Sequence, residues 1–107
     1  METKSAVRAL GALAQDTRLR IYRLLVQAGP AGLVVGDIGR RAGVAPATLS
    51  FHLKALRHAG LIEDRRDGRF IHYSANFPRM DALVGFLTEN CCGGAQCLPT
   101  RRVAVRA

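Results

Sequence analysis

Three cysteines near one end of the 107-residue chain are its most chemically distinctive residues: Cys91, Cys92 and Cys97. Thiolates are soft ligands that select thiophilic ions, whereas magnesium and calcium prefer oxygen. Zinc usually takes four ligands, and no histidine or fourth cysteine lies nearby in the sequence. Trivalent arsenic or antimony forms three bonds and keeps a lone pair, so three thiolates are enough for it. The cluster therefore predicts a site for As(III) or Sb(III).

The same thiols support other chemistry. They could form a disulfide as a redox switch, or remain three free thiols. Zinc would need a further ligand from elsewhere in the chain, such as His58 or His72. We expect a cytoplasmic protein, since the sequence has neither a membrane-spanning segment nor a signal peptide. In a reducing cytosol three cysteines are unlikely to form a structural disulfide framework, and their odd number also argues against one.

The charge of the chain indicates a polyanionic partner. Its 16 basic residues are mostly arginine and outnumber 8 acidic residues, which leaves a formal net charge of +8 and favours nucleic acid over a membrane. No apolar run approaches the roughly 20 residues of a membrane-spanning helix, and residues 1–14 lack the apolar core of a signal peptide. Asp37, Asp64 and the histidines have no spacing that supports a nucleophile and its base, so we expect no enzyme.

Five segments of the sequence have the apolar periodicity of helices. They cover residues 3–14, 16–28, 34–42 and 46–58 and a stretch after Pro78, with a loop at 31–33. Asp16 is a good N-cap for the second helix, and Gly43 ends the third. Pro46 suits the first turn of the fourth helix, because its missing N–H would have no partner there. Two helices joined by a short turn that contains glycine are typical of a helix-turn-helix.

A β-hairpin is expected after these helices. Residues 61–66 and 69–75 are strand-like, and Asp67 and Gly68 between them are a strong two-residue turn signal. A basic hairpin that follows a helix-turn-helix is a wing. We therefore predict an α+β fold, mostly α: a winged helix-turn-helix with about five helices and one β-hairpin wing. The expected division is a DNA-binding and dimerisation domain at 1–90 and a cysteine-containing segment with a basic tail at 91–107.

The segment at 46–58 has two distinct faces at 3.6 residues per turn. Leu49, Leu53 and Leu56 lie together and are expected to anchor the helix in the core. The opposite face is expected to meet the major groove of DNA and carries Ala47, Ser50, Phe51, Lys54 and His58, with Thr48 at one edge. Phe51 could instead pack against the wing. His52 lies beside the leucines and is expected to be buried or half-buried and bonded to backbone.

Arg65, Arg66 and Arg69 surround the expected hairpin turn. We expect them to reach phosphates or an adjacent minor groove, the alternative being a solvated hairpin tip. His72 and Tyr73 are expected to pack or bond within the sheet.

Three stretches of the sequence resemble the ArsR/SmtB family of metal-responsive repressors. They are AGVAPATLSFHLKALRHAGLI at 42–62, DTRLRI at 16–21 and RRDGR at 65–69. The resemblance spans about residues 5–90 and implies a homodimeric winged helix-turn-helix repressor that leaves its double-stranded operator DNA when metal binds. It also implies base contacts by Thr48, Ser50 and Phe51. Dimerisation through the first and last helices is implied as well, with the candidate contacts Val7, Leu10, Leu13, Leu83, Val84 and Leu87.

The chain departs from the family pattern at its metal sites. Residues 33–37 lack the cysteine pair of many arsenic sensors, and the last helix lacks the carboxylate and histidine set of the zinc sensors. Pro46 also replaces a glutamine that is common at the start of the recognition helix. What remains is Cys91, Cys92 and Cys97, which resembles the C-terminal three-cysteine arsenite site of one branch of the family.

The function that this resemblance implies is an As(III)-responsive or Sb(III)-responsive repressor, released from DNA when the metalloid binds three thiolates. A thiol redox-sensing repressor and a sensor of another thiophilic metal are alternatives on the same scaffold. A zinc-stapled or constitutive architectural DNA binder is the third.

Overall fold

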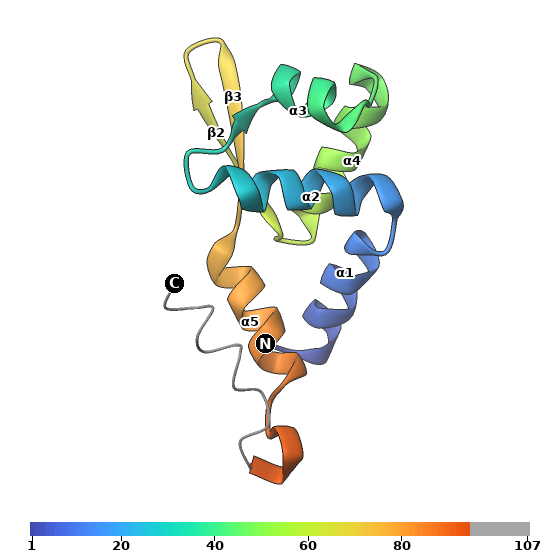
Figure 1. The fold of residues 1–107 in the computed structure, drawn as a ribbon, viewed down its shortest axis with the longest axis vertical. Coiled ribbons are helices and arrows are strands. Elements are labelled where there is room, and N and C mark those ends of the chain that lie inside the picture. Colours follow the sequence, from blue (N-terminus) through green and yellow to red (C-terminus); the bar gives the residue numbers. More distant parts are fainter. Residues whose placement is uncertain (95–107) are drawn as a thin grey trace.

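The structure is a computed structural model that describes residues 1–94 (Figure 1). Its elements are α1 (Thr3–Leu13), α2 (Asp16–Ala28), β1 (Leu33–Val34), α3 (Val35–Ala42), α4 (Pro46–His58), β2 (Ile62–Asp67), β3 (Phe70–Ala75), α5 (Phe77–Leu87) and the 3₁₀ helix η1 (Cys91–Gly94). The five expected helices and the β-hairpin wing are confirmed. No helix in the described part of the chain is long and apolar enough to cross a membrane.

Local capping sets the ends of the helices. Gln15 caps α2, because its side-chain Oε1 accepts a hydrogen bond from the backbone N–H of Arg18 at 2.8 Å. The prediction of Asp16 as the cap was wrong: Asp16 is already helical, and its carboxylate lies 3.9 Å from Arg20 one turn later. Gly43 ends α3 in the left-handed conformation, as expected, with φ 69° and ψ 42°.

The wing belongs to a three-stranded antiparallel sheet with the order β1-β3-β2. Strands β2 and β3 pair from Ile62 opposite Ala75 to Asp67 opposite Phe70. Strand β1 pairs with the other edge of β3, where Leu33 lies opposite Tyr73. The expected loop at 31–33 was therefore wrong at Leu33. Two residues are too few to show the alternation by which a strand is recognised in a sequence.

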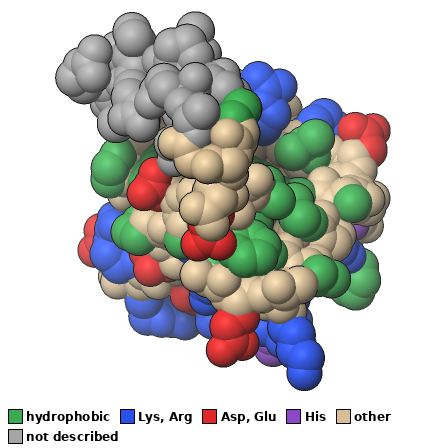
Figure 2. Space-filling model, turned by 90° about the horizontal axis from the view of Figure 1, so that it is seen from below, with side chains coloured by type: hydrophobic (Ala, Val, Ile, Leu, Met, Phe, Trp, Pro, Cys, Tyr) green, Lys and Arg blue, Asp and Glu red, His purple; other side chains and the backbone are tan. Residues whose placement is uncertain are grey.

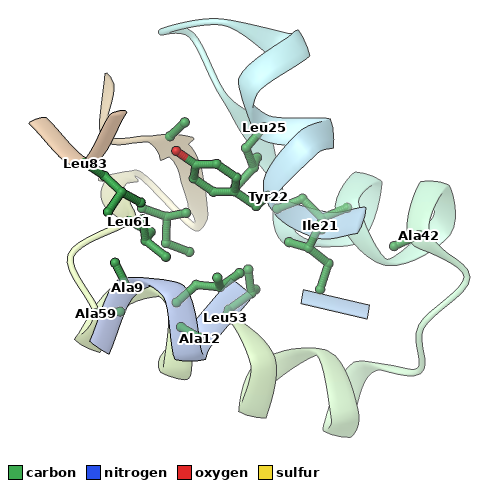
Figure 3. Packing of buried hydrophobic residues seen from close by; sticks show 14 of the residues in the cluster. Ala9, Ala12, Ile21, Tyr22, Leu25, Ala42, Leu53, Ala59, Leu61 and Leu83 are labelled. Carbon is green, nitrogen blue, oxygen red and sulfur yellow. The ribbon is translucent and has the colours of Figure 1, made fainter. Parts of the chain in front are cut away.

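The core joins the two ends of the molecule through α2 (Figure 1). The wing and α3 lie at one end, and α1 and α5 lie at the other. Ile21 and Leu25 of α2 and Leu61, which precedes β2, belong to the same core cluster, and all three are fully buried (Figure 3). Helix α2 packs against α1 on one side and against α3 and α4 on the other, and this packing ties both ends into one hydrophobic cluster.

Tyr22 adds an unusual polar group to this core. Its hydroxyl is buried without a hydrogen-bond partner among residues 1–94, and burial raises the pKa of the phenol. A buried unsatisfied polar group costs about 1–3 kcal/mol. Replacing Tyr22 by phenylalanine is therefore expected to raise the free energy of unfolding by about 1 kcal/mol, measured by urea denaturation. A decrease would show that the hydroxyl has a partner in the assembled protein.

Candidate nucleic-acid interface and thiol cluster

Helix α4 has one buried and one exposed face, as its sequence predicts. Leu49, Leu53 and Leu56 are buried in the core. The residues predicted to face DNA are all exposed: Ala47, Thr48, Ser50, Phe51 and Lys54. Pro46 stands in the first turn, where its ring does not interrupt the hydrogen bonds of the helix. The helix therefore presents small and polar side chains, one aromatic ring and one cation to solvent.

Three side chains join α4 to α2 at this surface. His52 is only 7% exposed, and its Nδ1 accepts a hydrogen bond from Nε of Arg18 at 3.1 Å. The burial of His52 was predicted correctly, but its expected backbone partner was wrong. The Arg18 guanidinium also lies over the Phe51 ring, 5.4 Å from its centre. Phe51 remains 62% exposed, so most of its ring stays available to a ligand.

The environment of His52 predicts a pH-dependent stability. Burial first, and then the positive charge of Arg18, lower the pKa of His52 below its ordinary value of 6.5. Below pH 6.5 the unfolded chain binds this proton more readily than the folded protein, so the free energy of unfolding falls as the pH falls. Urea denaturation between pH 8 and pH 5 should show a smaller fall for His52→Gln than for the unaltered protein. Equal falls would show that His52 is not the group responsible.

The wing carries its three predicted arginines in exposed positions: Arg65, Arg66 and Arg69. Arg65 pairs with His72 across the hairpin and Arg66 with Ile71. Since successive side chains of a strand point to opposite faces, Arg65 and Arg66 lie on opposite faces of the wing. Nη1 of Arg57 on α4 lies 3.6 Å from Oδ1 of Asp64 on β2. This contact connects the wing to α4.

His72 and Tyr73 lie within the sheet, as expected. Tyr73 packs against the core, and Nε2 of His72 lies 3.8 Å from Oδ2 of Asp67 across the hairpin.

Sequence reasoning missed Arg18 as a member of this surface. Periodicity places it on the polar side of α2 and says nothing of a partner 34 residues away. The one signal available is that no acidic residue lies three or four positions from Arg18 to pair with it within the helix.

The thiol cluster begins at Cys91, four residues after the end of α5. The sulfur atoms of Cys91 and Cys92 lie 3.6 Å apart. Asn90 and Cys92 both have a φ of 56°, so the backbone turns sharply here in a conformation that L residues seldom adopt. Cys91 has a free thiol, whereas Cys92 is disulfide-bonded. The predicted third ligand, Cys97, lies outside the described residues.

No group of three histidine, cysteine or acidic side chains within residues 1–94 could hold a metal ion. The idea that His58 or His72 completes a zinc site therefore finds no support in this part of the chain.

At the end of the molecule formed by α1 and α5, exposed apolar side chains lie among charged ones (Figure 2). Of the residues predicted to form a dimer contact, Val7, Leu10, Val84 and Leu87 are exposed. Leu13 is half-buried against the core. Leu83 is 6% exposed and belongs to the core of the monomer, which leaves it little surface for a partner. Its helical spacing could not distinguish the inner from the outer side of α5.

A family model described as a helix-turn-helix domain matches residues 13–65. This segment includes α2, α3 and α4 and enters the wing. Together with the hairpin, the match defines the class of protein: a winged helix-turn-helix transcriptional regulator rather than an enzyme.

Individual relatives identify the family within this class of protein. The chain is 40% identical over 77 residues to the uncharacterized HTH-type transcriptional regulator YceK of Bacillus subtilis, covering 71% of this chain and 76% of the relative. It is 39% identical over 74 residues to the arsenical resistance operon repressor of Escherichia coli, covering 67% and 62%. A homodimeric winged helix-turn-helix DNA-binding domain from Mycobacterium bovis, a possible ArsR-family regulator, matches with a TM-score of 0.64 at 30% identity, covering 88% and 87%. The chain belongs to the ArsR family of transcriptional regulators.

Other relatives are named for different metals. The cadmium resistance regulatory protein CadC homolog of Staphylococcus aureus is 33% identical, covering 68% of this chain and 59% of the relative. A probable mercury resistance operon repressor of Streptomyces lividans is 30% identical, covering 75% and 62%. Family membership therefore leaves the inducer open.

Proposed function

We propose that this protein is a cytoplasmic repressor that binds double-stranded operator DNA as a homodimer and is released by As(III) or Sb(III). The observation that supports a thiophilic inducer is the 3.6 Å separation of the Cys91 and Cys92 sulfur atoms, and the choice of As(III) or Sb(III) rests on the number of cysteines, which is three. Two sulfurs that each lie about 2.3 Å from a common thiophilic ion are themselves separated by about 3.5 to 3.8 Å. Cys97 would supply the third thiolate, and because Cys92 is disulfide-bonded in the structure, the site would form after reduction.

The exposed face of α4 and the arginines of the wing support DNA binding. In this proposal Thr48, Ser50 and Phe51 contact base edges, while Ala47 can touch a thymine methyl group. Lys54 and the wing arginines neutralise phosphates, which agrees with a net charge of +8.

The exposed apolar side chains on α1 and α5 support the homodimer. Val7 is 62% exposed and Leu87 58%, although both are large apolar residues. Burial of such side chains against a second copy is favourable at about 25 cal/mol per Å² of apolar area. Cys91 lies four residues after the end of α5, so a metalloid bound there would lie close in the chain to this proposed interface and could change the spacing of the two DNA-binding ends.

Thiol oxidation is the second candidate trigger, because Cys92 is already disulfide-bonded in the structure. Both triggers act on the same segment. They differ in what is consumed: an oxidant removes two hydrogens for each disulfide formed, whereas As(III) binds thiolates without changing their oxidation state.

Fluorescence anisotropy on DNA from the upstream region of its own gene tests the proposed function. Reduced protein is titrated at fixed salt with As(III), Sb(III), Cd(II), Hg(II), Zn(II) and, separately, with peroxide. Release at stoichiometric As(III) or Sb(III), with zinc inert, is the expected result. Release only by another metal or only by peroxide would show that the inducer is that metal or an oxidant. Release by none of these reagents would contradict the proposed sensing function.

The wing is expected to contribute two phosphate contacts per subunit. Replacing Arg66 and Arg69 by glutamine should reduce the slope of log affinity against log salt by about 2 per subunit, at all DNA sequences alike. Lys4→Gln removes one positive charge from α1, at the end of the molecule away from the wing (Figure 1), and should leave the slope unchanged. An unchanged slope in the double variant would show that the wing does not touch the DNA backbone.

A further inference from the structure

Arg18 has a position that the proposed function does not yet use. It lies in the first turn of α2, where the Gln15 side chain holds its backbone N–H at 2.8 Å. Its own side chain reaches α4 and contacts two neighbouring residues there, His52 and Phe51. A residue fixed at its backbone and bonded at its tip is well suited to hold another element in place.

The contacts of Arg18 are specific in geometry. Its Nε–H donates to Nδ1 of His52, which requires a neutral imidazole with its proton on Nε2. Cζ of the same guanidinium lies over the Phe51 ring, 5.4 Å from the ring centroid, within the range of a cation–π interaction. The rings of Phe51 and His52 themselves lie 5.5 Å apart in an edge-to-face arrangement. Arg18, His52 and Phe51 therefore restrain one another.

Phe51 is the member of this group that faces solvent. Phe51 is 62% exposed, so few other contacts restrict its side-chain conformation. An aromatic ring on the DNA-facing side of a helix must be placed accurately to meet a thymine methyl group, and an unrestrained ring loses conformational entropy on binding. Because Arg18 already restrains the Phe51 ring in the free protein, the ring loses less conformational entropy when DNA binds.

We propose that Arg18 is a positioning residue for DNA recognition, which orients Phe51 on the exposed face of α4 and locks it through His52. This role rests on the proposed DNA-binding function. The lowered pKa of His52 agrees with it, since a neutral imidazole is the acceptor that Arg18 needs. From the same helix, Arg20 donates to the backbone carbonyl of Ala42 at 2.6 Å. Helix α2 thus holds both helices of the helix-turn-helix.

Sequence discrimination is the first measurement. Affinities of the unaltered protein, Arg18→Lys, Phe51→Leu and the double variant are compared on the operator and on operators with single A·T pairs exchanged. Arg18→Lys keeps the charge but loses the Nε–H donor to His52, so the cation is no longer fixed over the Phe51 ring and discrimination should fall by about fivefold. In the Phe51→Leu background the same change should have no further effect. Equal effects of Arg18→Lys in both backgrounds would overturn the positioning role.

Arg18 could alternatively bind a phosphate directly, and the salt dependence separates the two roles. Arg18→Gln should leave the slope of log affinity against log salt unchanged if Arg18 only positions Phe51. A decrease of about 1 per subunit with unchanged discrimination would show a phosphate contact instead and would overturn the proposal.

An NMR measurement without DNA distinguishes failure of this inference from failure of the proposed function. In the unaltered protein, the ¹⁵N shifts of His52 should show a neutral ring protonated at Nε2, and Arg18→Lys should move the signals of both His52 and the Phe51 ring. Unchanged signals would overturn the inference even if the protein binds its operator. Failure of the unaltered protein to bind DNA, with the signals moved as expected, would remove the proposed function and leave Arg18 only its orienting contact with Phe51. Circular dichroism and thermal unfolding confirm that the variants fold.

Discussion

Replacing Cys91 by serine is expected to abolish the release of DNA by As(III) while leaving the affinity for the operator unchanged. Serine removes one soft ligand, and the two remaining thiolates cannot complete a three-coordinate site. Allosteric coupling of 1–3 kcal/mol corresponds to a weakening of DNA binding by roughly 5- to 150-fold, and all of it should disappear. Anisotropy of the reduced variant on operator DNA, with and without As(III), measures both quantities.

A neighbouring carboxylate provides the matched control for this experiment. Glu89 is exposed two residues before Cys91, and Glu89→Gln changes a side chain that a thiophilic ion does not select. This variant should respond to As(III) like the unaltered protein, and Cys97→Ser should fail to respond. A Cys91→Ser protein that still releases DNA at the original As(III) concentration would exclude the three-thiolate site.

Replacing Gly32 by alanine is expected to lower the free energy of unfolding by about 2 to 4 kcal/mol. Gly32 has a φ of +74°, and a β-carbon added there would lie 2.3 Å from the backbone oxygen of Tyr73. The clash is with backbone, so no side-chain rotation relieves it. Strand β1 would have to separate from β3. Urea denaturation at fixed protein concentration measures the loss.

Gly43 separates the effect of backbone conformation from that of the clash. It also has a positive φ, of +69°, but an added β-carbon would meet no atom within 4 Å. Gly43→Ala should therefore show only the cost of the left-handed conformation, about 1–2 kcal/mol. If the two variants lose the same stability, the close approach between β1 and β3 contributes nothing measurable.

Elements whose signals are local could be predicted from the order of the residues alone. Leucines at helical spacing in 46–58 predicted both faces of α4, since periodicity alone decides which side chains share a side of a helix. Gly43, Pro46 and the Asp67-Gly68 pair predicted boundaries, because their backbone preferences act without distant partners. The clustering of cysteines within seven residues likewise needed no fold to be noticed.

Features that depend on residues far apart in the chain could not be predicted without the fold. Arg18 meets His52 across 34 residues, and the pairing of β1 with β3 joins positions 40 residues apart at Leu33 and Tyr73. Leu83 lies in the core rather than on the outer side of α5 because α5 packs against α1 and places Leu83 close to Leu61 (Figure 3). Such contacts follow from how the helices pack around one core, and a one-dimensional pattern carries no record of which polar side chain or sheet edge that packing brings into contact.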